Sequence, residues 1–181
     1  MNPQDRTYKL GDNFVMVIGV SKFDVDKEWE LIKELRSASN GVVSIQAVRA
    51  DAVFGIAHIL EVLKISLEAE KRDIKLVSRI EMDLFLRVSC TNQLSKALID
   101  TGLTNQTPGC FILFSKDRTK LMKVAEHICS LDVKVDNSVL KPTKRKQELI
   151  CEYLGIRLNK NLLPYQSFTS FLSERASLLN K

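Results

Sequence analysis

The chain has 181 residues, of which 45% are hydrophobic and 27% are charged. This length suits one domain with a single hydrophobic core, and the composition is too apolar for a chain that stays disordered. The sequence has no run of 18 apolar residues, and charged side chains stand where a signal peptide would be apolar, at Asp5, Arg6, Lys9 and Asp12. We therefore expect a folded cytoplasmic protein that does not enter a membrane, found also in the nucleus if its source is eukaryotic.

The first predicted elements are a strand and a helix. The β-branched run 13–20 predicts a short buried strand. A helix follows it, with Asp24 or Asp26 as its cap, and Asn40-Gly41 is a helix stop. Four further elements are predicted in chain order, a strand at 42–48 and helices at 51–72, 78–88 and 92–101.

Two of these helices carry end signals, and one is apolar on several sides. Ser78 and Glu81 have the spacing of a capping box, and Gly102 ends the helix at 92–101. The helix at 51–72 has more apolar residues than one stripe can hold, which predicts a central helix.

The rest of the chain returns to the sheet and then becomes helical. Pro108-Gly109 predicts a turn, followed by a strand at 110–114 and an amphipathic helix at 117–130. A helix after the basic run 141–146 continues to residue 154, and a last helix follows Pro164. No repeat or linker interrupts the sequence, so we predict one mixed α and β domain over 1–181.

The net charge of +5 is unevenly distributed. Residues 141–181 hold eight basic and three acidic side chains, whereas residues 1–140 hold 19 of each. Such a basic end indicates a polyanionic partner, because cations that neutralise phosphates release bound counterions. A solvated basic surface without a partner explains the same pattern.

Motifs for catalysis, metals and cofactors are missing from the sequence. It has no glycine-rich phosphate loop, no nucleophile elbow and no paired histidines at metal-binding spacing. The widely spaced cysteines Cys90, Cys110, Cys129 and Cys151 are expected to be buried free thiols. We therefore expect no enzymatic activity, metal, cofactor or small-molecule substrate.

One polar cluster stands out in an otherwise apolar segment. Arg49, Asp51 and His58 lie at a predicted strand end and in the first turns of the helix after it. In one interpretation Asp51 caps the helix and His58 is a satisfied, partly buried histidine. In the other, the helix N-terminus and Arg49 face a phosphate or base that His58 contacts.

The stretch 46–60, QAVRADAVFGIAHIL, resembles the signature of the PRPK-binding family, the small subunit of the KEOPS/EKC complex. The segments 76–86 and 93–98, and the helix ending at Gly102, are similar to the family as well. The resemblance covers residues 42–115. It implies an α+β fold, with a helical bundle packed beside a small, mainly antiparallel sheet, and no enzymatic activity.

The resemblance also implies partners. The complex installs threonylcarbamoyl on the adenosine next to the anticodon of certain tRNAs, and its small subunit docks on the N-lobe of an atypical kinase/ATPase. In archaeal relatives the small subunit captures the 3′ CCA end of tRNA. Carried over by motif, Asp51 and His58 face the tRNA, with Arg49 and Arg79 as basic neighbours.

This chain departs from the family at one point that concerns RNA. Many relatives have a basic residue where this chain has Asn92, and the segment 89–91 lacks the usual glycine. We expect a basic cluster to supply the missing phosphate contact, formed by Lys141, Lys144, Arg145 and Lys146.

The surface that binds the kinase is a choice between two predicted helix faces. One contains Trp29, Ile32 and Leu35, and the other contains Leu84 and Phe85. Sequence alone does not separate an interface from an internal packing face.

Two alternative functions remain open. The first is a protein-only scaffold or regulator of the kinase, which the absence of a basic residue at Asn92 would permit. The second is an unrelated small enzyme in which His58 is a general base oriented by Asp51 or Glu61.

Overall fold

The computed structural model describes residues 7–22, 28–105, 107–131, 133–157 and 163–180. These fall into two compact units, each formed by two separate stretches of the chain. The sheet unit comprises residues 1–50 and 103–139, and the helical unit comprises residues 51–102 and 140–181. One cooperative domain over 1–181 stays a prediction. Within the described residues no helix is both long and apolar enough to cross a membrane.

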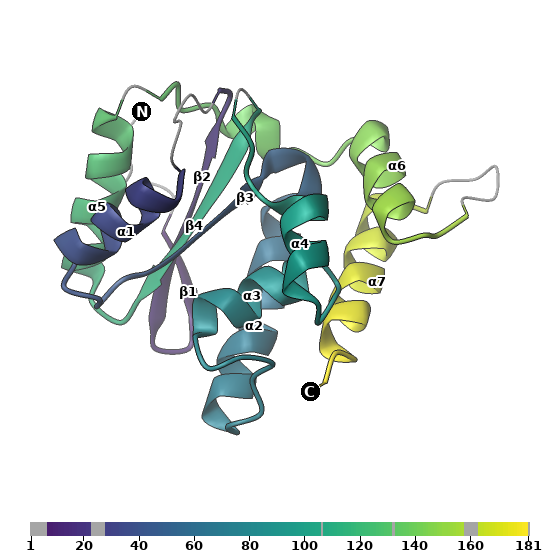
Figure 1. The fold of residues 1–181 in the computed structure, drawn as a ribbon, viewed down its shortest axis with the longest axis horizontal. Helices are drawn as coiled ribbons and strands as arrows, with labels where there is room; N and C mark the ends of the chain where they lie inside the picture. Colours follow the sequence, from purple (N-terminus) through teal and green to yellow (C-terminus); the bar gives the residue numbers. More distant parts are fainter. Residues whose placement is uncertain (1–6, 23–27, 106, 132, 158–162, 181) are drawn as a thin grey trace. The chain divides into compact units, whose positions relative to one another are not determined.

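The sheet unit is built on a four-stranded antiparallel sheet of order β1-β2-β4-β3 (Figure 1). Its strands are β1 (Tyr8–Leu10), β2 (Asn13–Val20), β3 (Ser44–Arg49) and β4 (Gly109–Ser115). All seven residues of β4 are buried, and β4 lies between β2 and β3. The predicted strands at 13–20, 42–48 and 110–114 are therefore confirmed, whereas β1 was not predicted.

Two helices pack on this sheet, α1 (Glu28–Ala38) and α5 (Arg118–Ser130). Leu35 of α1 and Leu121 of α5 join one buried cluster with alternate strand residues such as Ile18 and Leu113. Alternation is expected because successive side chains of a strand point to opposite faces.

The ends of both helices follow local sequence signals. The Asp117 side chain accepts a hydrogen bond of 3.0 Å from the backbone N–H of Lys120 and caps α5. Asn40 and Gly41 have positive φ angles after α1, and the N–H of Gly41 bonds to the carbonyl of Arg36, as the helix stop predicted. The predicted caps Asp24 and Asp26 lie outside the described residues.

The helical unit contains five α-helices in its described residues (Figure 1). They are α2 (Ile56–Lys71), α3 (Ile80–Val88), α4 (Leu94–Thr101), α6 (Lys144–Tyr153) and α7 (Tyr165–Ser177). The central helix α2 packs against both α3 and α7. Phe54, just before α2, meets the ring of Phe168 edge-on at 4.8 Å between centroids. The predicted α+β fold is confirmed.

Two predicted helix starts are wrong. The helix predicted from Asp51 begins only at Ile56, because residues 50–52 form a 3-10 turn and Gly55 has φ 92°. The helix predicted from Ser78 begins at Ile80 and has no side-chain cap. Glu81 does not complete a capping box; its carboxylate pairs with Arg79.

The cysteines differ in exposure. Cys90, Cys110 and Cys151 are buried free thiols, as predicted, whereas Cys129 is exposed. The prediction is wrong for Cys129 because α5 turns Val124, Ala125 and Ile128 to the core and leaves that position on its outer side.

Candidate functional site

His58 lies in the first turn of α2 and is fully buried. Its Nδ1 accepts a hydrogen bond of 3.3 Å from the backbone N–H of Phe54, which leaves the proton of the neutral ring on Nε2. Burial, and secondarily the charge of Lys146, lower the pKa of His58 from 6.5 to about 4. In the described residues Nε2 has no hydrogen-bond partner. His58 is therefore a neutral interior histidine with one unused donor.

Lys146 is buried against the segment that precedes α2 and His58. It is 8% exposed, and its Nζ donates a hydrogen bond of 3.0 Å to the carbonyl of Val53. The Thr143 side chain caps α6 by accepting from the backbone N–H of Lys146. Lys146 therefore fixes α6 to the segment before α2 and differs from the other members of its basic cluster.

Those other members lie on the surface at the beginning of α6. Lys141, Lys144 and Arg145 are exposed, and Arg145 approaches Glu148 to 3.6 Å in an exposed pair. The first turn of α6 contains no acidic residue. The basic side chains and the positive end of the helix dipole thus act together to attract an anion.

The remaining residues predicted to face tRNA are Arg49, Asp51 and Arg79. Arg49 ends β3 in the sheet unit and is half-buried. Asp51 is a half-buried member of the 3-10 turn and does not cap α2, whose N-cap position is Gly55. Arg79 is exposed and donates to the Glu81 carboxylate through two nitrogens, at 2.9 and 2.6 Å.

The side chains predicted to bind the kinase lie in the cores of their own units. Ile32 and Leu35 are 8% and 0% exposed in the sheet unit, and Leu84 and Phe85 are 0% and 2% exposed in the helical unit. The side chain of Trp29 lies outside the described residues. The described members of this set stabilise the fold and offer little surface to a partner.

An exposed apolar surface does occur on α4, where the sequence reading did not place one. Leu94, Leu98 and Ile99 are 47%, 55% and 77% exposed, whereas Ala97 and Thr101 form the buried side of the helix. In the structure α4 buries its small residues and exposes its large ones, and the sequence carries no signal of this arrangement. Periodicity assigns large apolar residues to the core and therefore misses this arrangement.

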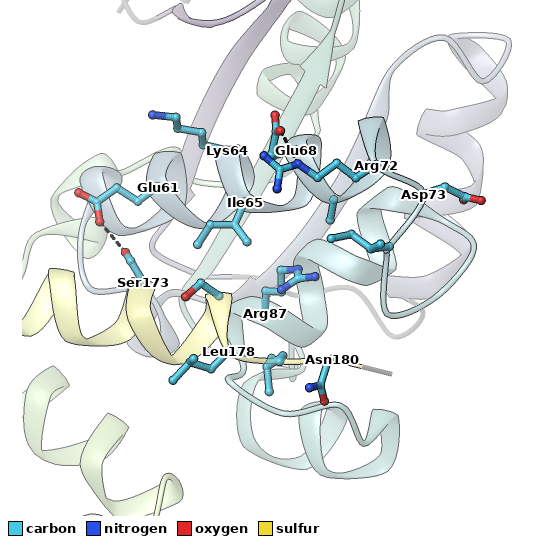
Figure 2. Close-up of a pocket in the computed structure, with 14 residues that line it drawn as sticks. Glu61, Lys64, Ile65, Glu68, Arg72, Asp73, Arg87, Ser173, Leu178 and Asn180 are labelled. Atoms are coloured by element: carbon cyan, nitrogen blue, oxygen red, sulfur yellow. Dashed lines mark hydrogen bonds and ion pairs between the residues drawn. The ribbon is translucent and has the colours of Figure 1, made fainter.

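The helical unit also has an open groove of 980 Å³ along α2 and the end of α7 (Figure 2). Ile65 and Ala69 of α2 and Leu178 after α7 give the groove an apolar lining. The buried Arg87 of α3 also lines it. At one end, Ser173 of α7 donates a hydrogen bond to Glu61 of α2, as Figure 2 shows.

The enzyme alternative uses His58 as a general base, with Asp51 or Glu61 to orient it. In the structure His58 is shielded from solvent, and Glu61 accepts a hydrogen bond from Ser173. Within the described residues no group of three or more metal-ligating side chains comes together.

Comparisons with known proteins add no relatives: no protein-family model matches the chain, and no curated protein matches it. The expected resemblance to the PRPK-binding family, in the segments 46–60, 76–86 and 93–98, stays a prediction. The last of these contains the first half of α4 and its exposed Leu94 and Leu98.

Proposed function

We propose that this protein is a non-catalytic KEOPS/EKC subunit, which binds the atypical kinase/ATPase subunit and recruits the 3′ CCA end of tRNA for threonylcarbamoyladenosine modification. The observation that carries the proposal is the apolar surface of α4, formed by Leu94, Leu98 and Ile99. It falls in a part of the chain that resembles the PRPK-binding family. Exposed apolar side chains gathered on one helix are typical of a protein-binding surface.

The geometry of α4 favours a docked protein over a solvated helix. Leu94 and Leu98 are one helical turn apart and therefore adjacent on the surface. Lys96, the cation of this helix, is already bonded to Asp100 and to the carbonyl of Tyr153. Its charge is satisfied locally, so a partner could cover the leucines without leaving it unpaired.

Kinase binding is tested by co-purification of the kinase subunit with a Leu94→Glu/Leu98→Glu variant. We expect affinity to fall by about tenfold or more, because two carboxylates would have to be desolvated in the interface. The matched control is Ile74→Glu/Val77→Glu, which places the same charges on exposed apolar residues outside α4. Circular dichroism verifies that both variants fold. Unchanged binding by the α4 variant would contradict docking on this helix.

Recruitment of tRNA is supported by the exposed cations at the beginning of α6. Lys141, Lys144 and Arg145 lie next to a helix N-terminus that has no acidic residue in its first turn. Contacts from such cations to phosphates contribute affinity that does not depend on sequence and falls with salt.

The test for this surface is filter binding of tRNA to a Lys141→Gln/Lys144→Gln/Arg145→Gln variant over a range of salt. We expect weaker binding and a salt slope reduced by about one for each lost phosphate contact. The control Lys64→Gln/Lys71→Gln/Arg72→Gln removes the same charge from exposed residues of α2 and its end. An unchanged slope in the α6 variant removes this cluster from the RNA contact.

A protein-only scaffold of the kinase is the second candidate. It is favoured by the burial of His58 and Lys146, and by the pairing of Arg79 with Glu81. This candidate predicts kinase binding that depends on α4 and no salt-dependent binding of tRNA.

A further inference from the structure

The sheet unit contains a pocket of 340 Å³ between the end of α1 and one side of α5. From α1 and the turn after it come Leu35, Ala38, Ser39 and Asn40, and from α5 come Lys120, Lys123, Val124 and His127. The pocket shares no residue with α4 or with the basic cluster of α6, and the proposed function makes no use of it.

Three nitrogen-bearing side chains of α5 converge on this pocket. Lys120, Lys123 and His127 are three and four positions apart, which aligns them along one side of the helix. Among the described residues neither lysine forms an ion pair. His127 Nε2 is inaccessible to solvent, has no hydrogen-bond partner there, and lies 3.8 Å from Glu34 Oε1.

An ordinary structural role for these cations would be to bond the free carbonyl groups at the end of α1. Two of those carbonyls already have partners. The carbonyl of Arg36 accepts from Ser39 Oγ at 2.9 Å and from the N–H of Gly41 at 3.0 Å, and that of Ser37 accepts from the N–H of Asn40. In the described part of the chain neither lysine side chain bonds to the end of α1, so both can be available to a ligand.

The lysine ammonium groups and the Asn40 amide are donors suited to a phosphate group. Pockets for small ligands begin at about 300 Å³, so the volume admits one nucleotide. Leu35 and Val124 add apolar lining that a base or ribose could contact. We propose that this pocket binds the phosphate of a nucleotide, either free or within an RNA strand.

The test is a titration of the full chain, followed by the amide NMR signals of residues 38–40 and 120–127. The probes are AMP, inorganic phosphate, and adenosine, which lacks the phosphate. We expect saturable shifts with AMP and with phosphate, and none with adenosine. Absence of saturable shifts with AMP and phosphate, or equal shifts with adenosine, would overturn the proposal.

Variants separate a built pocket from general attraction of anions. Lys120→Gln/Lys123→Gln should weaken AMP binding by about tenfold, because two charge-assisted hydrogen bonds are lost. Lys116→Gln/Arg118→Gln removes the same charge from exposed residues beside the pocket and should leave affinity within about threefold. Equal losses in the two variants would overturn the proposal.

A second substitution keeps the lysines in place. Ala38→Glu sets a carboxylate at the pocket and should weaken AMP binding while α1, in which Glu is a good helix former, stays folded. Undiminished binding in this variant would count against the pocket. Adding tRNA to the AMP complex identifies the source: displacement of AMP indicates an RNA phosphate, and retained AMP indicates a free nucleotide.

Discussion

Asp83 and Arg87 form a buried ion pair within α3, with Oδ2 and Nε 2.8 Å apart and side chains 0% and 3% exposed. Each partner also makes a contact outside the helix. Asp83 Oδ1 accepts from the backbone N–H of Leu76 at 2.7 Å, and Arg87 donates to the carbonyl of Ala176 at 2.7 Å. The pair thereby joins α3 to the preceding loop and to the last turn of α7.

Breaking this pair from one side should be costly. Arg87→Met leaves the Asp83 carboxylate buried without its cation, and we expect the free energy of unfolding to fall by about 3 to 5 kcal/mol. The control Arg72→Met removes an exposed pair with Glu68 and should cost at most about 1 kcal/mol. Urea unfolding measures both. Equal losses would show that burial of the pair contributes nothing.

Stability should depend on pH through His58. Its pKa is about 4 in the folded state and 6.5 in an unfolded chain, so between these values the unfolded state binds more protons. His58 should therefore lower the free energy of unfolding as pH drops from 6.5 to 4, with a contribution of about 3 kcal/mol.

Urea unfolding at pH 7, 5.5 and 4.5 measures this effect. A His58→Gln variant should lose less stability over the same range than the unsubstituted chain, and His127→Gln is the control that keeps the His58 contribution. Parallel curves for the unsubstituted chain and His58→Gln would contradict a neutral, buried His58.

Much of the fold follows from local sequence. The run 13–20 forms β2 without a shift, and Asp117 caps α5 as its position indicates. The predicted start of α2 was wrong because Gly55 takes a positive φ, at a position where a side chain would meet Pro142, which is distant in the sequence. The three-residue strand β1 is too short to show alternation.

The sites were less predictable because they depend on contacts between distant segments. The burial of His58 and the contact of Lys146 with Val53 arise only when α6 packs beside the start of α2. The pocket between α1 and α5 likewise joins parts of the sequence that carry no shared motif.

Gly55 gives a test of the break before α2. A Cβ at this position would lie 3.0 Å from Pro142 Cγ, and its φ of 92° strains any other residue. We expect Gly55→Ala to reduce the free energy of unfolding by about 2 kcal/mol or more. Gly11→Ala is the control, since Gly11 has positive φ and open space, and should cost about 1 kcal/mol. A smaller loss for Gly55→Ala than for Gly11→Ala would count against close packing on Pro142.

Thiol reactivity should single out Cys129. It is the exposed cysteine, and access of the reagent sets it apart, because partial burial raises the pKa of Cys129 as well and burial raises that of Cys90 to about 11. Titration with an aromatic disulfide reagent should modify Cys129 first in the folded protein and the other three only after denaturation. A Cys129→Ser variant that keeps the fast reaction would show that a buried thiol opens to solvent.

The most direct test of the proposed function compares binding of intact tRNA with binding of the same tRNA stripped of its 3′ CCA, at two salt concentrations. We predict that intact tRNA binds, that binding weakens at the higher salt, and that it is lost without CCA. Equal binding of the two RNAs, or binding of neither, would contradict recruitment of the tRNA 3′ end by this protein.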